Sequence, residues 1–413
     1  MVKLRPLAFP MQLPRTSRRE GHVTGGLDCR CRPEPVSVAL EMIDIFRGGP
    51  IDTMDSIFEA TQRYERWMRS CMPIVESALR EKHNEMRDDV FSFLRATYFR
   101  WAQLFPVVCP DLSEGPTILA IGDLHVGSFG TWRDSEGRLC WGVDDFDQSH
   151  PLPYGNDLVR LAASVRLVAD DASIGLRFRK ACDTILEGYE CTLRKGPRPI
   201  VLAENETDLE KLGFEALKSP PDFWETLLRK PTLSLRELPR DARAALEQTL
   251  PARGLEYKVV RRQAGVGSLG QPRYVAIAAW QGGCVAREAK AYLPSMEAYR
   301  HRRRRDRICY YEKAIRTASR APDPYQLVTG KWIIRRLSPD SNPIEQADLP
   351  DERDDEVLLY AMAQEVANVH LAAREARSRI LRDLQRQPRG WLRAAGKQMA
   401  KVTKHDWKAY TAG

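Results

Sequence analysis

The fold of this chain is decided by three short segments: Gly122-Asp-Leu-His-Val-Gly-Ser-Phe-Gly130, Asp144-Asp-Phe-Asp147 and Pro153-Tyr-Gly-Asn-Asp-Leu158. The first follows an apolar run over 117–121 and the second follows another over 138–143, and both runs are typical of short buried strands. The third opens a helix over 157–168 with an apolar face. Carboxylates on tight turns at strand ends suit a hard cation such as Mg²⁺, because phosphate oxygens can complete its shell. The three segments therefore predict a cation site, although any single Asp at a strand end could be a turn residue.

A glycine-rich turn, Gly265-Val-Gly-Ser-Leu-Gly270, lies between predicted strands at 257–262 and 273–280. Its position in a strand–turn–strand, and not in a strand–turn–helix, argues against a dinucleotide fingerprint and favours a phosphate-binding flap. Gly265, Gly267 and Gly270 would let backbone amides, together with Ser268, approach phosphate oxygens. The alternative is a plain hairpin with a glycine turn.

The order Gly-Asp-Leu-His, Asp-Phe-Asp and Pro-x-x-x-Asp-Leu resembles the catalytic core of aminoglycoside and choline phosphotransferases, which have the kinase-like fold. The resemblance implies that Asp123 orients or deprotonates the acceptor hydroxyl and that Asp157 braces the catalytic loop. It implies that Asp145 holds Mg²⁺ on the phosphates of ATP, with Asp147 and Ser128 as further candidate ligands. Ser128 departs from the pattern, which has Asn at that position.

The same resemblance implies a lysine on the third strand of the small lobe, which pairs with the nucleotide phosphates and with a glutamate on the next helix. That strand, predicted at 285–292, carries Arg287-Glu-Ala-Lys290. Lys290 is the first candidate and Arg287 the second, and the two point to opposite faces of the strand, so they cannot share the role. In the predicted helix over 295–316, Glu297 and Glu312 remain alternative partners.

Over about residues 50–410 the chain also resembles a bacterial family known as domain of unknown function 2252. The matching segments are Phe93-Leu-Arg-Ala-Thr97, Gly122-Asp-Leu-His125, Asp145-Phe-Asp147, Asp157-Leu-Val-Arg-Leu161, Gly265-Val-Gly-Ser-Leu-Gly270, Arg287-Glu-Ala289 and Val366-Ala-Asn-Val-His370. Typical members of that family have Asn at the positions of Ser128 and Asp144, so this chain differs from them there. Many members also have Lys at the position of Arg287. No activity follows from this resemblance.

We expect an α+β, two-lobed kinase-like fold that is circularly permuted, because the catalytic loop precedes the glycine flap. The predicted parts are a disordered basic arm over 1–48, a helical lobe with the catalytic loop over 49–254, a small β-rich lobe over 255–340, and helices over 341–413 that complete the helical lobe. A long helix at 355–382 and another at 391–410 are expected in the last part, and a fourth strand at 332–337 in the β-rich lobe.

The predicted function is ATP- and Mg²⁺-dependent phosphoryl transfer to a small molecule or protein, with nucleotidyl transfer by the same site as a variant. The alternative is a nucleotide-binding pseudokinase that acts as a regulatory or interaction module, which Ser128 and Arg287 favour. For His125 a structural role is favoured over a phosphate contact, and His370, on an apolar helix face, is expected to be a core or capping residue.

Composition limits the other classes of function. No apolar run approaches the ~18 residues of a membrane span, and nine scattered cysteines fit a cytoplasmic protein with reduced thiols. The net charge of +8 is concentrated at 374–408, which has eleven Lys or Arg residues against three acids, and in a basic run at 301–307. We do not expect nucleic acid as a partner, because the aromatic residues that would stack on bases are sparse among these cations.

Overall fold

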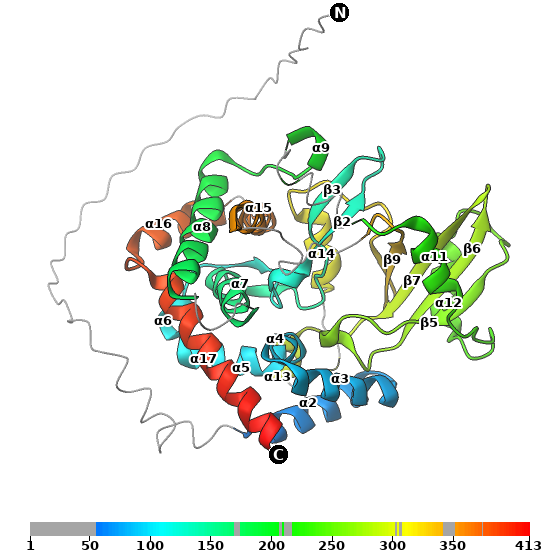
Figure 1. The fold of residues 1–413 in the computed structure, drawn as a ribbon, viewed down its shortest axis with the longest axis horizontal. Helices are drawn as coiled ribbons and strands as arrows, with labels where there is room; N and C mark the ends of the chain where they lie inside the picture. The colour runs from blue at the N-terminus through cyan, green and yellow to red at the C-terminus, as the bar shows by residue number, and fades with distance from the viewer. Residues whose placement is uncertain are drawn as a thin grey trace, which may run out of the picture. The chain divides into compact units, whose positions relative to one another are not determined.

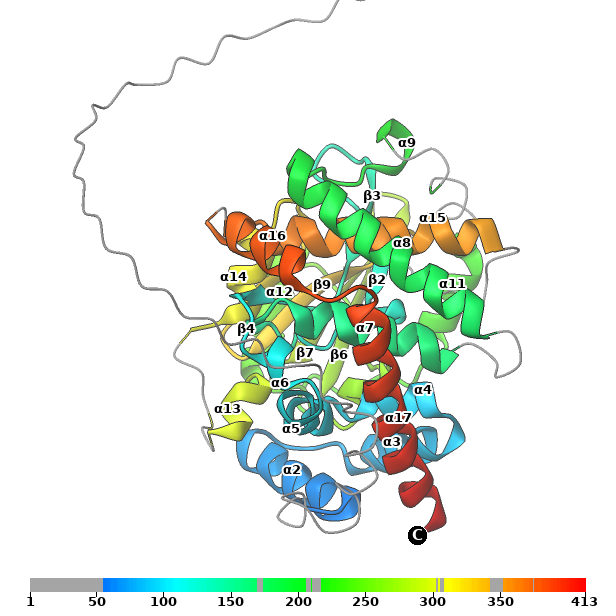
Figure 2. The ribbon, with the colours of Figure 1, turned by 90° about the vertical axis from the view of Figure 1, so that its left-hand side faces the viewer.

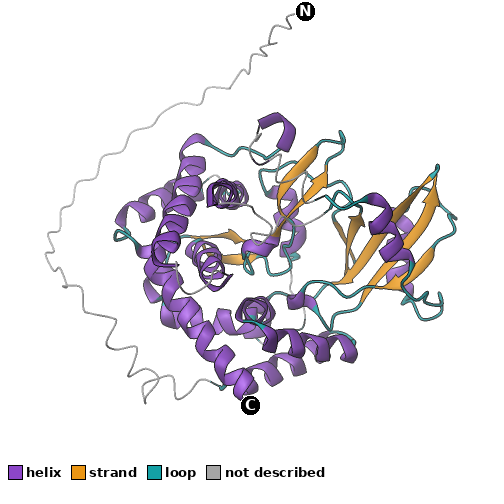
Figure 3. Cartoon of the chain, in the orientation of Figure 1, coloured by secondary structure: helices purple, strands orange, loops and turns teal. Residues whose placement is uncertain are grey.

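The computed structural model describes residues 55–168, 174–205, 209, 217–301, 304, 308–341, 352–373 and 375–413. Residues Asp55–Gly413 form one compact unit. The predicted arm at 1–48 and most of the basic run at 301–307 lie outside the described residues. The fold is α+β, as predicted, and Figure 3 shows most of the helices apart from a five-stranded sheet.

The described chain begins with helices, and the buried residues of the first recur at helical spacing. Ser56 starts the first of them with a capping box, in which its side chain accepts from the Glu59 N–H and the Glu59 carboxylate accepts from the Ser56 N–H. The helices are α2 (Ile57–Cys71), α3 (Glu76–Asp88), α4 (Val90–Ala96), α5 (Tyr98–Val108) and α6 (Pro110–Ser113).

Two antiparallel strand pairs carry the acidic segments. β1 (Thr117–Ala120) pairs with β4 (His150–Pro153), and β2 (Phe129–Arg133) pairs with β3 (Leu139–Val143). The strands predicted at 117–121 and 138–143 are present as β1 and β3. β2 and β4 were not predicted, because β2 begins in the glycine-rich loop and β4 contains Pro151 and Pro153, which are unfavourable in strands. Because Ala120 pairs with His150, the turn after β1 lies beside the turn before β4.

Helix α7 (Gly155–Val168) is buried from Gly155 to Val165 and packs against α8 (Ile174–Lys195) and α17 (Trp391–Ala412). α8 in turn packs against α15 (Glu352–His370), and Figure 2 shows these helices from the side. The single helix predicted at 355–382 is wrong: α15 ends at His370, and α16 (Ala376–Arg386) begins after a break. Residues 371–375 contain neither Gly nor Pro, so the sequence holds no stop signal there.

The second β-structure is an antiparallel sheet with strand order β5-β6-β7-β9-β8, visible at the right of Figure 1. Its strands are β5 (Lys258–Arg261), β6 (Arg273–Trp280), β7 (Gly283–Ala291), β8 (Leu327–Thr329) and β9 (Trp332–Leu337). Four of the five strands lie where they were predicted, and the three-residue β8 was not predicted. The helix predicted at 295–316 is wrong as one element, because α13 (Met296–Arg300) and α14 (Tyr310–Thr317) are separate helices.

Each face of this sheet has its own helix. Leu238, Ala242 and Leu246, in and before α12 (Arg240–Thr249), pack with Ala289 and Ala291 of β7. On the opposite face, Leu227 of α11 (Pro220–Leu228) packs with Ala286. Beyond Ala286 on this second face, β7 presents Glu288 and Lys290, so α11 leaves a charged part of the face for the acidic turns. The remaining short helix is α9 (Leu202–Asn205).

In the part of the chain that the structure describes, no helix is both long enough and apolar enough to cross a membrane.

Candidate functional site

Asp157 holds the turn after β1 in place. Its side chain is completely buried and accepts hydrogen bonds from the backbone N–H groups of Ile121 (2.7 Å) and Gly122 (3.0 Å). The Nε2 of His370, at the end of α15, lies 3.0 Å from Asp157 Oδ2, and its Nδ1 lies 2.8 Å from the Tyr189 hydroxyl. The sequence prediction of Asp157 as a brace and of His370 as a buried structural histidine agrees with these contacts.

Asp123 projects from the same turn and is paired with an arginine that the sequence analysis missed. Arg160, completely buried on α7, donates to Asp123 Oδ1 from Nε (2.8 Å) and from Nη2. Both donors use Oδ1, and Oδ2 faces the glycine flap, 3.7 Å from the position that a Cβ on Gly267 would occupy. Burial raises the pKa of Asp123 despite the opposing charge of Arg160. Oδ2 is therefore the oxygen that could take a proton.

Ser128 and His125 are both engaged within the loop. The Ser128 hydroxyl accepts from the His125 N–H (3.1 Å) and donates to the Asp123 carbonyl (3.3 Å). The His125 Nδ1 accepts from the Gly127 N–H (3.1 Å), and burial lowers the pKa of this imidazole well below its ordinary value. A neutral, capping His125 agrees with the structural role that the sequence favoured. The Ser128 side chain serves the loop, so its predicted role as a metal ligand has no support in these contacts.

The Asp144–Asp147 turn meets Lys290 of β7. Lys290 Nζ donates to Asp147 Oδ2 and lies 3.8 Å from Asp145 Oδ2. Lys290 and Asp147 are 143 positions apart in the sequence. The Asp147 N–H also donates to Asp145 Oδ1 (3.0 Å), which orients the two carboxylates. The structure therefore brings Lys290 close to Asp145, the two residues that the sequence assigned to phosphate and Mg²⁺. The direct contact with Asp147 was not predicted.

Burial and pairing act differently on these two acids. Partial loss of solvent opposes ionisation of Asp145, whose side chain is half-exposed, but the Lys290 ammonium and the Asp147 N–H hold the pKa of Asp145 well below its ordinary range. Burial and the charge of Asp145 raise the pKa of Asp147, against the effect of Lys290. The two aspartates thus carry at least one negative charge beside the ammonium of Lys290, whose side chain is 4% exposed.

Further charged residues on this face of the sheet were missed by the sequence analysis. Glu288 is buried between Arg273 (3.0 Å) and Arg262 (2.8 Å), and Arg335 of β9 pairs with Asp144 (3.0 Å). The Arg262 and Arg273 charges hold the pKa of Glu288 down, at about 2, although burial opposes them. Arg273 and Glu288 lie on neighbouring strands, whereas Arg335 of β9 reaches the turn after β3, which belongs to another strand pair. A single sequence carries no signal of which of these segments are neighbours.

Arg287, the second candidate for the phosphate-binding cation, lies away from this cluster. Its Nε donates to the Thr249 carbonyl at the end of α12 (3.0 Å), and its guanidinium lies 4.1 Å from the centre of the Tyr325 ring. The two glutamates considered as partners of Lys290 are also elsewhere, because Glu297 pairs with Arg300 and Glu312 pairs with Arg316. The pairing of Lys290 with a glutamate of the following helix is therefore wrong, and aspartates take that place.

The glycine flap packs on the helices beside Asp123. Gly265 (φ 72°) and Gly270 (φ 94°) begin and end the turn in a backbone conformation that other residues rarely adopt. Gly267 lies so close to α4 that a Cβ there would be 2.9 Å from the Arg95 carbonyl oxygen. The Ser268 hydroxyl binds within the turn and accepts from Arg273 Nη2 (2.6 Å). The structure thus places the flap next to Asp123.

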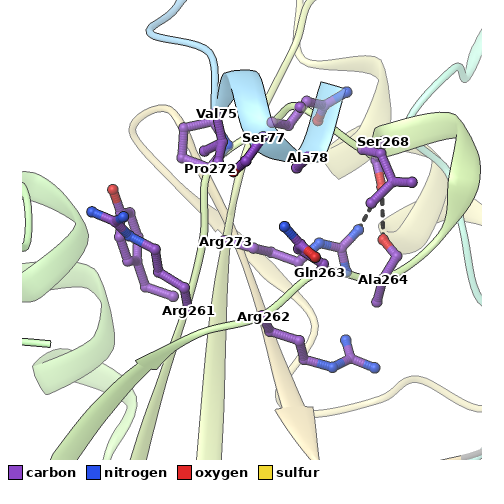
Figure 4. A pocket seen from close by; sticks show the side chains of 14 residues that line it. Val75, Ser77, Ala78, Arg261, Arg262, Gln263, Ala264, Ser268, Pro272 and Arg273 are labelled. Carbon is purple, nitrogen blue, oxygen red and sulfur yellow. Dashed lines mark hydrogen bonds between the residues drawn. The ribbon is translucent and has the colours of Figure 1, made fainter. Parts of the chain in front are cut away.

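A pocket of about 90 Å³ lies beside the flap and is drawn in Figure 4. Val75 and Ser77 at the start of α3 form one wall, and the flap from Ser268 to Gly270 forms another. Arg262 and Arg273 extend to one side of the strands and Arg261 to the other, so these three cations do not converge.

The residues present fit Mg²⁺ if phosphate and water complete the shell. Among the described residues, no group of three or more His, Cys, Asp and Glu side chains is arranged to hold a metal. Asp145 and Asp147 supply carboxylate oxygens on one turn, and the Asp145 side chain is 47% exposed. Two carboxylates with substrate phosphates are the ligands that Mg²⁺ commonly takes, so the donor set suits this ion.

Comparison with known proteins places part of the chain in context. No curated protein and no solved structure matches it. Residues 74–216, which include Asp123, Ser128, Asp145, Asp147 and Asp157, match the model of a family described as an uncharacterized protein conserved in bacteria, DUF2252.

Proposed function

We propose that the protein is an ATP- and Mg²⁺-dependent phosphotransferase with a kinase-like site. The observation that carries the proposal is the meeting of Lys290 with Asp145 and Asp147, next to a glycine flap and an Asp123 held by a braced loop. A strand lysine, a turn with two acids and a glycine-rich turn are the parts that phosphoryl transfer needs for binding and charge stabilisation.

In this proposal, Asp145 and Asp147 hold Mg²⁺ and Lys290 binds phosphate oxygens. When bound, Mg²⁺ neutralises negative charge on the β- and γ-phosphates. Lys290 contacts a carboxylate in the described structure, so it is already oriented toward the position where such a cation would be held. The amides of the flap from Gly265 to Gly270 would contact the same phosphates.

Asp123 is the proposed base. The oxygen of the acceptor hydroxyl forms a bond to the γ-phosphorus, the bond from that phosphorus to the β–γ bridging oxygen breaks, and ADP leaves. The hydroxyl proton passes to Asp123 Oδ2. Arg160 keeps Oδ1 occupied and the carboxylate oriented, and the raised pKa of Asp123 makes it a stronger base than an exposed aspartate.

The order of the parts supports a circularly permuted kinase-like fold as part of this proposal. The flap and Lys290 follow the catalytic loop in sequence, yet Lys290 reaches Asp147 and Gly267 lies beside Asp123. Residues 255–340, together with α11 and α12 on the faces of their sheet, would then be the small lobe, and the other helices on both sides in sequence would form the other lobe.

Nucleotide binding is tested first by thermal unfolding with millimolar Mg·ATP. Ligand at 100 times its dissociation constant should add about 2.7 kcal/mol of stability. Asp145→Asn should abolish most of this gain, whereas Asp88→Asn, an exposed control on α3, should keep it. A melting temperature of the unmodified protein that does not respond to Mg·ATP would contradict the proposal.

Turnover is tested with γ-labelled ATP, by following ATP consumption and labelling of the protein. Asp123→Asn should lower turnover while Mg·ATP binding stays largely intact, because Asp123 acts on the acceptor and not on the metal. If Asp123→Asn and Asp145→Asn lose ATP binding equally, the assigned roles are wrong. Transfer of the nucleotidyl group in place of the γ-phosphate would appear with α-labelled and not with γ-labelled ATP.

The second candidate function is a nucleotide-binding pseudokinase, and Ser128 is the observation that favours it. The Ser128 hydroxyl forms hydrogen bonds with the His125 N–H and the Asp123 carbonyl of its own loop. It therefore does not replace the Asn oxygen that would bind Mg²⁺ at this position in the phosphotransferase pattern. Binding of Mg·ATP without consumption would support this function. If Ser128→Asn then gained about tenfold in Mg²⁺ affinity together with ATP turnover, the site would be a decayed phosphotransferase.

A further inference from the structure

Lys82 is a buried cation at the tip of the flap. It lies on α3, is 4% exposed, and its Nζ donates to the Gly267 carbonyl at 3.1 Å. The centre of the Tyr64 ring lies 5.8 Å from the same nitrogen. Sequence analysis did not single out this lysine, because it belongs to an ordinary amphipathic helix.

The hydrogen bonding of Lys82 is incomplete. An ammonium group has three N–H donors, and within the described ranges the Gly267 carbonyl is the one hydrogen-bond acceptor for Lys82, with no carboxylate in ion-pair contact. Burial of a cation without a full set of partners costs free energy. Such a group is retained at a cost to stability, which is typical of residues that receive an anionic ligand.

Lys82 and Asp123 lie on either side of the same glycine. Lys82 binds the carbonyl of Gly267, and the Cβ position of Gly267 is 3.7 Å from Asp123 Oδ2. The negative charge of Asp123 acts on Lys82, which also places the two groups in one neighbourhood. A group at this point would meet an ammonium, the flap backbone and the proposed base together.

We propose that Lys82 binds the terminal phosphoryl group of a nucleoside triphosphate, at the point where the flap tip meets Asp123. The inference rests on the proposed function and adds a binding residue to it. Lys290 binds oxygens of the inner phosphates, whereas Lys82 contacts the oxygens of the phosphoryl group that is transferred. Lys82 therefore distinguishes a triphosphate from a diphosphate.

The test is calorimetric titration with Mg·ADP and with a Mg²⁺ complex of a non-hydrolysable ATP analogue. Lys82→Met should weaken binding of the analogue on the order of tenfold, or ~1.4 kcal/mol, and leave ADP binding unchanged. Lys82→Arg, which retains the charge, should keep at least part of the preference for the triphosphate. Arg80→Met removes an exposed cation from the same helix and should change neither affinity.

The possible failures are distinguishable. If the unmodified protein binds both nucleotides, and Lys82→Met weakens both equally or neither, Lys82 does not contact the terminal phosphoryl group. If the unmodified protein binds neither nucleotide, the proposed function fails and the role of Lys82 fails with it. Should Lys82→Met not fold, Lys82→Gln takes its place. Loss of the triphosphate preference in Lys82→Gln, with the preference at least partly kept in Lys82→Arg, would support the inference. An unchanged preference in Lys82→Gln, or a tenfold loss of analogue affinity in Arg80→Met, would overturn it.

Discussion

At the residue scale, Asp157 shows how one buried carboxylate positions a loop. Four donors surround its two oxygens: two backbone N–H groups of the turn, the His370 imidazole and the Asn156 amide. A carboxylate with four acceptor positions can satisfy all four donors, whereas an amide of the same size cannot. The position of Asp123 on that turn therefore depends on the charge at Asp157 as well as on its shape.

We expect Asp157→Asn to lower the free energy of unfolding by about 3 kcal/mol, because the new NH₂ group faces donors and leaves buried N–H groups unpaired. Urea denaturation measures this change. Asp88→Asn, at an exposed position of α3, should stay within about 0.5 kcal/mol of the unmodified protein. Equal stability of the two variants would show that the buried hydrogen bonds of Asp157 contribute little.

The pKa of Lys82 leads to a second prediction at this scale. Burial lowers the pKa of Lys82 to about 8, although the carboxylates of Glu65 and Asp123 act to raise it. Below that pH both folded and unfolded chains carry the proton. Between about pH 8 and about pH 10.5 the unfolded chain holds a proton that the folded chain has released, so the free energy of unfolding rises with pH in this window.

The unmodified protein should therefore gain about 3 kcal/mol relative to Lys82→Met between about pH 8 and about pH 10.5. The comparison removes the contributions of all other titrating groups, because both proteins share them. Urea denaturation at a series of pH values measures the difference. Parallel curves for the two proteins would contradict the lowered pKa of Lys82.

At the scale of elements, the flap and α4 are joined by close backbone packing. Gly267 lies against the Arg95 carbonyl, and α3 holds the same turn through Lys82 and through the hydrogen bond from the Val75 N–H to the Gly270 carbonyl (2.8 Å). Two helices thus fix a turn that would otherwise be a free hairpin loop. The nearest obstacle to a side chain at Gly267 is backbone, which cannot rotate away.

Gly267→Ala should therefore destabilise the protein by about 1–3 kcal/mol and loosen the flap. Hydrogen exchange of the amides at 264–271 should become faster, and urea denaturation gives the stability change. Gly283→Ala is the matched control, because a Cβ there meets nothing within 4 Å and its φ is not positive. If both variants show the same exchange rates at 264–271, the close contact does not constrain the flap.

At the scale of the whole molecule, the pairing of Lys290 with Asp147 joins the five-stranded sheet to the helical part of the chain. Asp144 with Arg335 (3.0 Å) adds a second link between the same turn and the sheet. Removal of one partner from a buried ion pair leaves the other charge without compensation. The alignment of the proposed metal-binding turn with the flap depends on these links.

A double-mutant cycle measures the main link. Lys290→Met and Asp147→Asn should each destabilise by about 3 kcal/mol, and the double variant by less than their sum, with a coupling of about 1–3 kcal/mol. The control cycle uses Arg69 and Glu76, an exposed pair at 3.0 Å, for which the coupling should stay below about 1 kcal/mol. Additive effects at Lys290 and Asp147 would mean that the two side chains do not interact in solution.

Much of the local structure was predictable from the sequence. Short apolar runs located β1, β3, β5, β6, β7 and β9, because alternation and β-branched residues mark strands locally. The same period placed Lys290 and Arg287 on opposite faces of β7, and the structure has them there. The position of acids directly after predicted strands identified Asp123, Asp145 and Asp147 as candidates, and one tight turn holds Asp145 and Asp147 together.

The pairings between distant residues were decided by the tertiary structure alone. Four such pairings join distant segments: Arg160 with Asp123, Glu288 with two arginines, Lys82 with Gly267, and His370 with Asp157. The hydrophobic periodicity of neither segment indicates that the two are in contact. The break between α15 and α16 is of the same kind, because 371–375 holds no helix-stopping residue. Local propensity determines where elements form, whereas the burial of charge requires partners that only the packed chain brings within hydrogen-bonding distance.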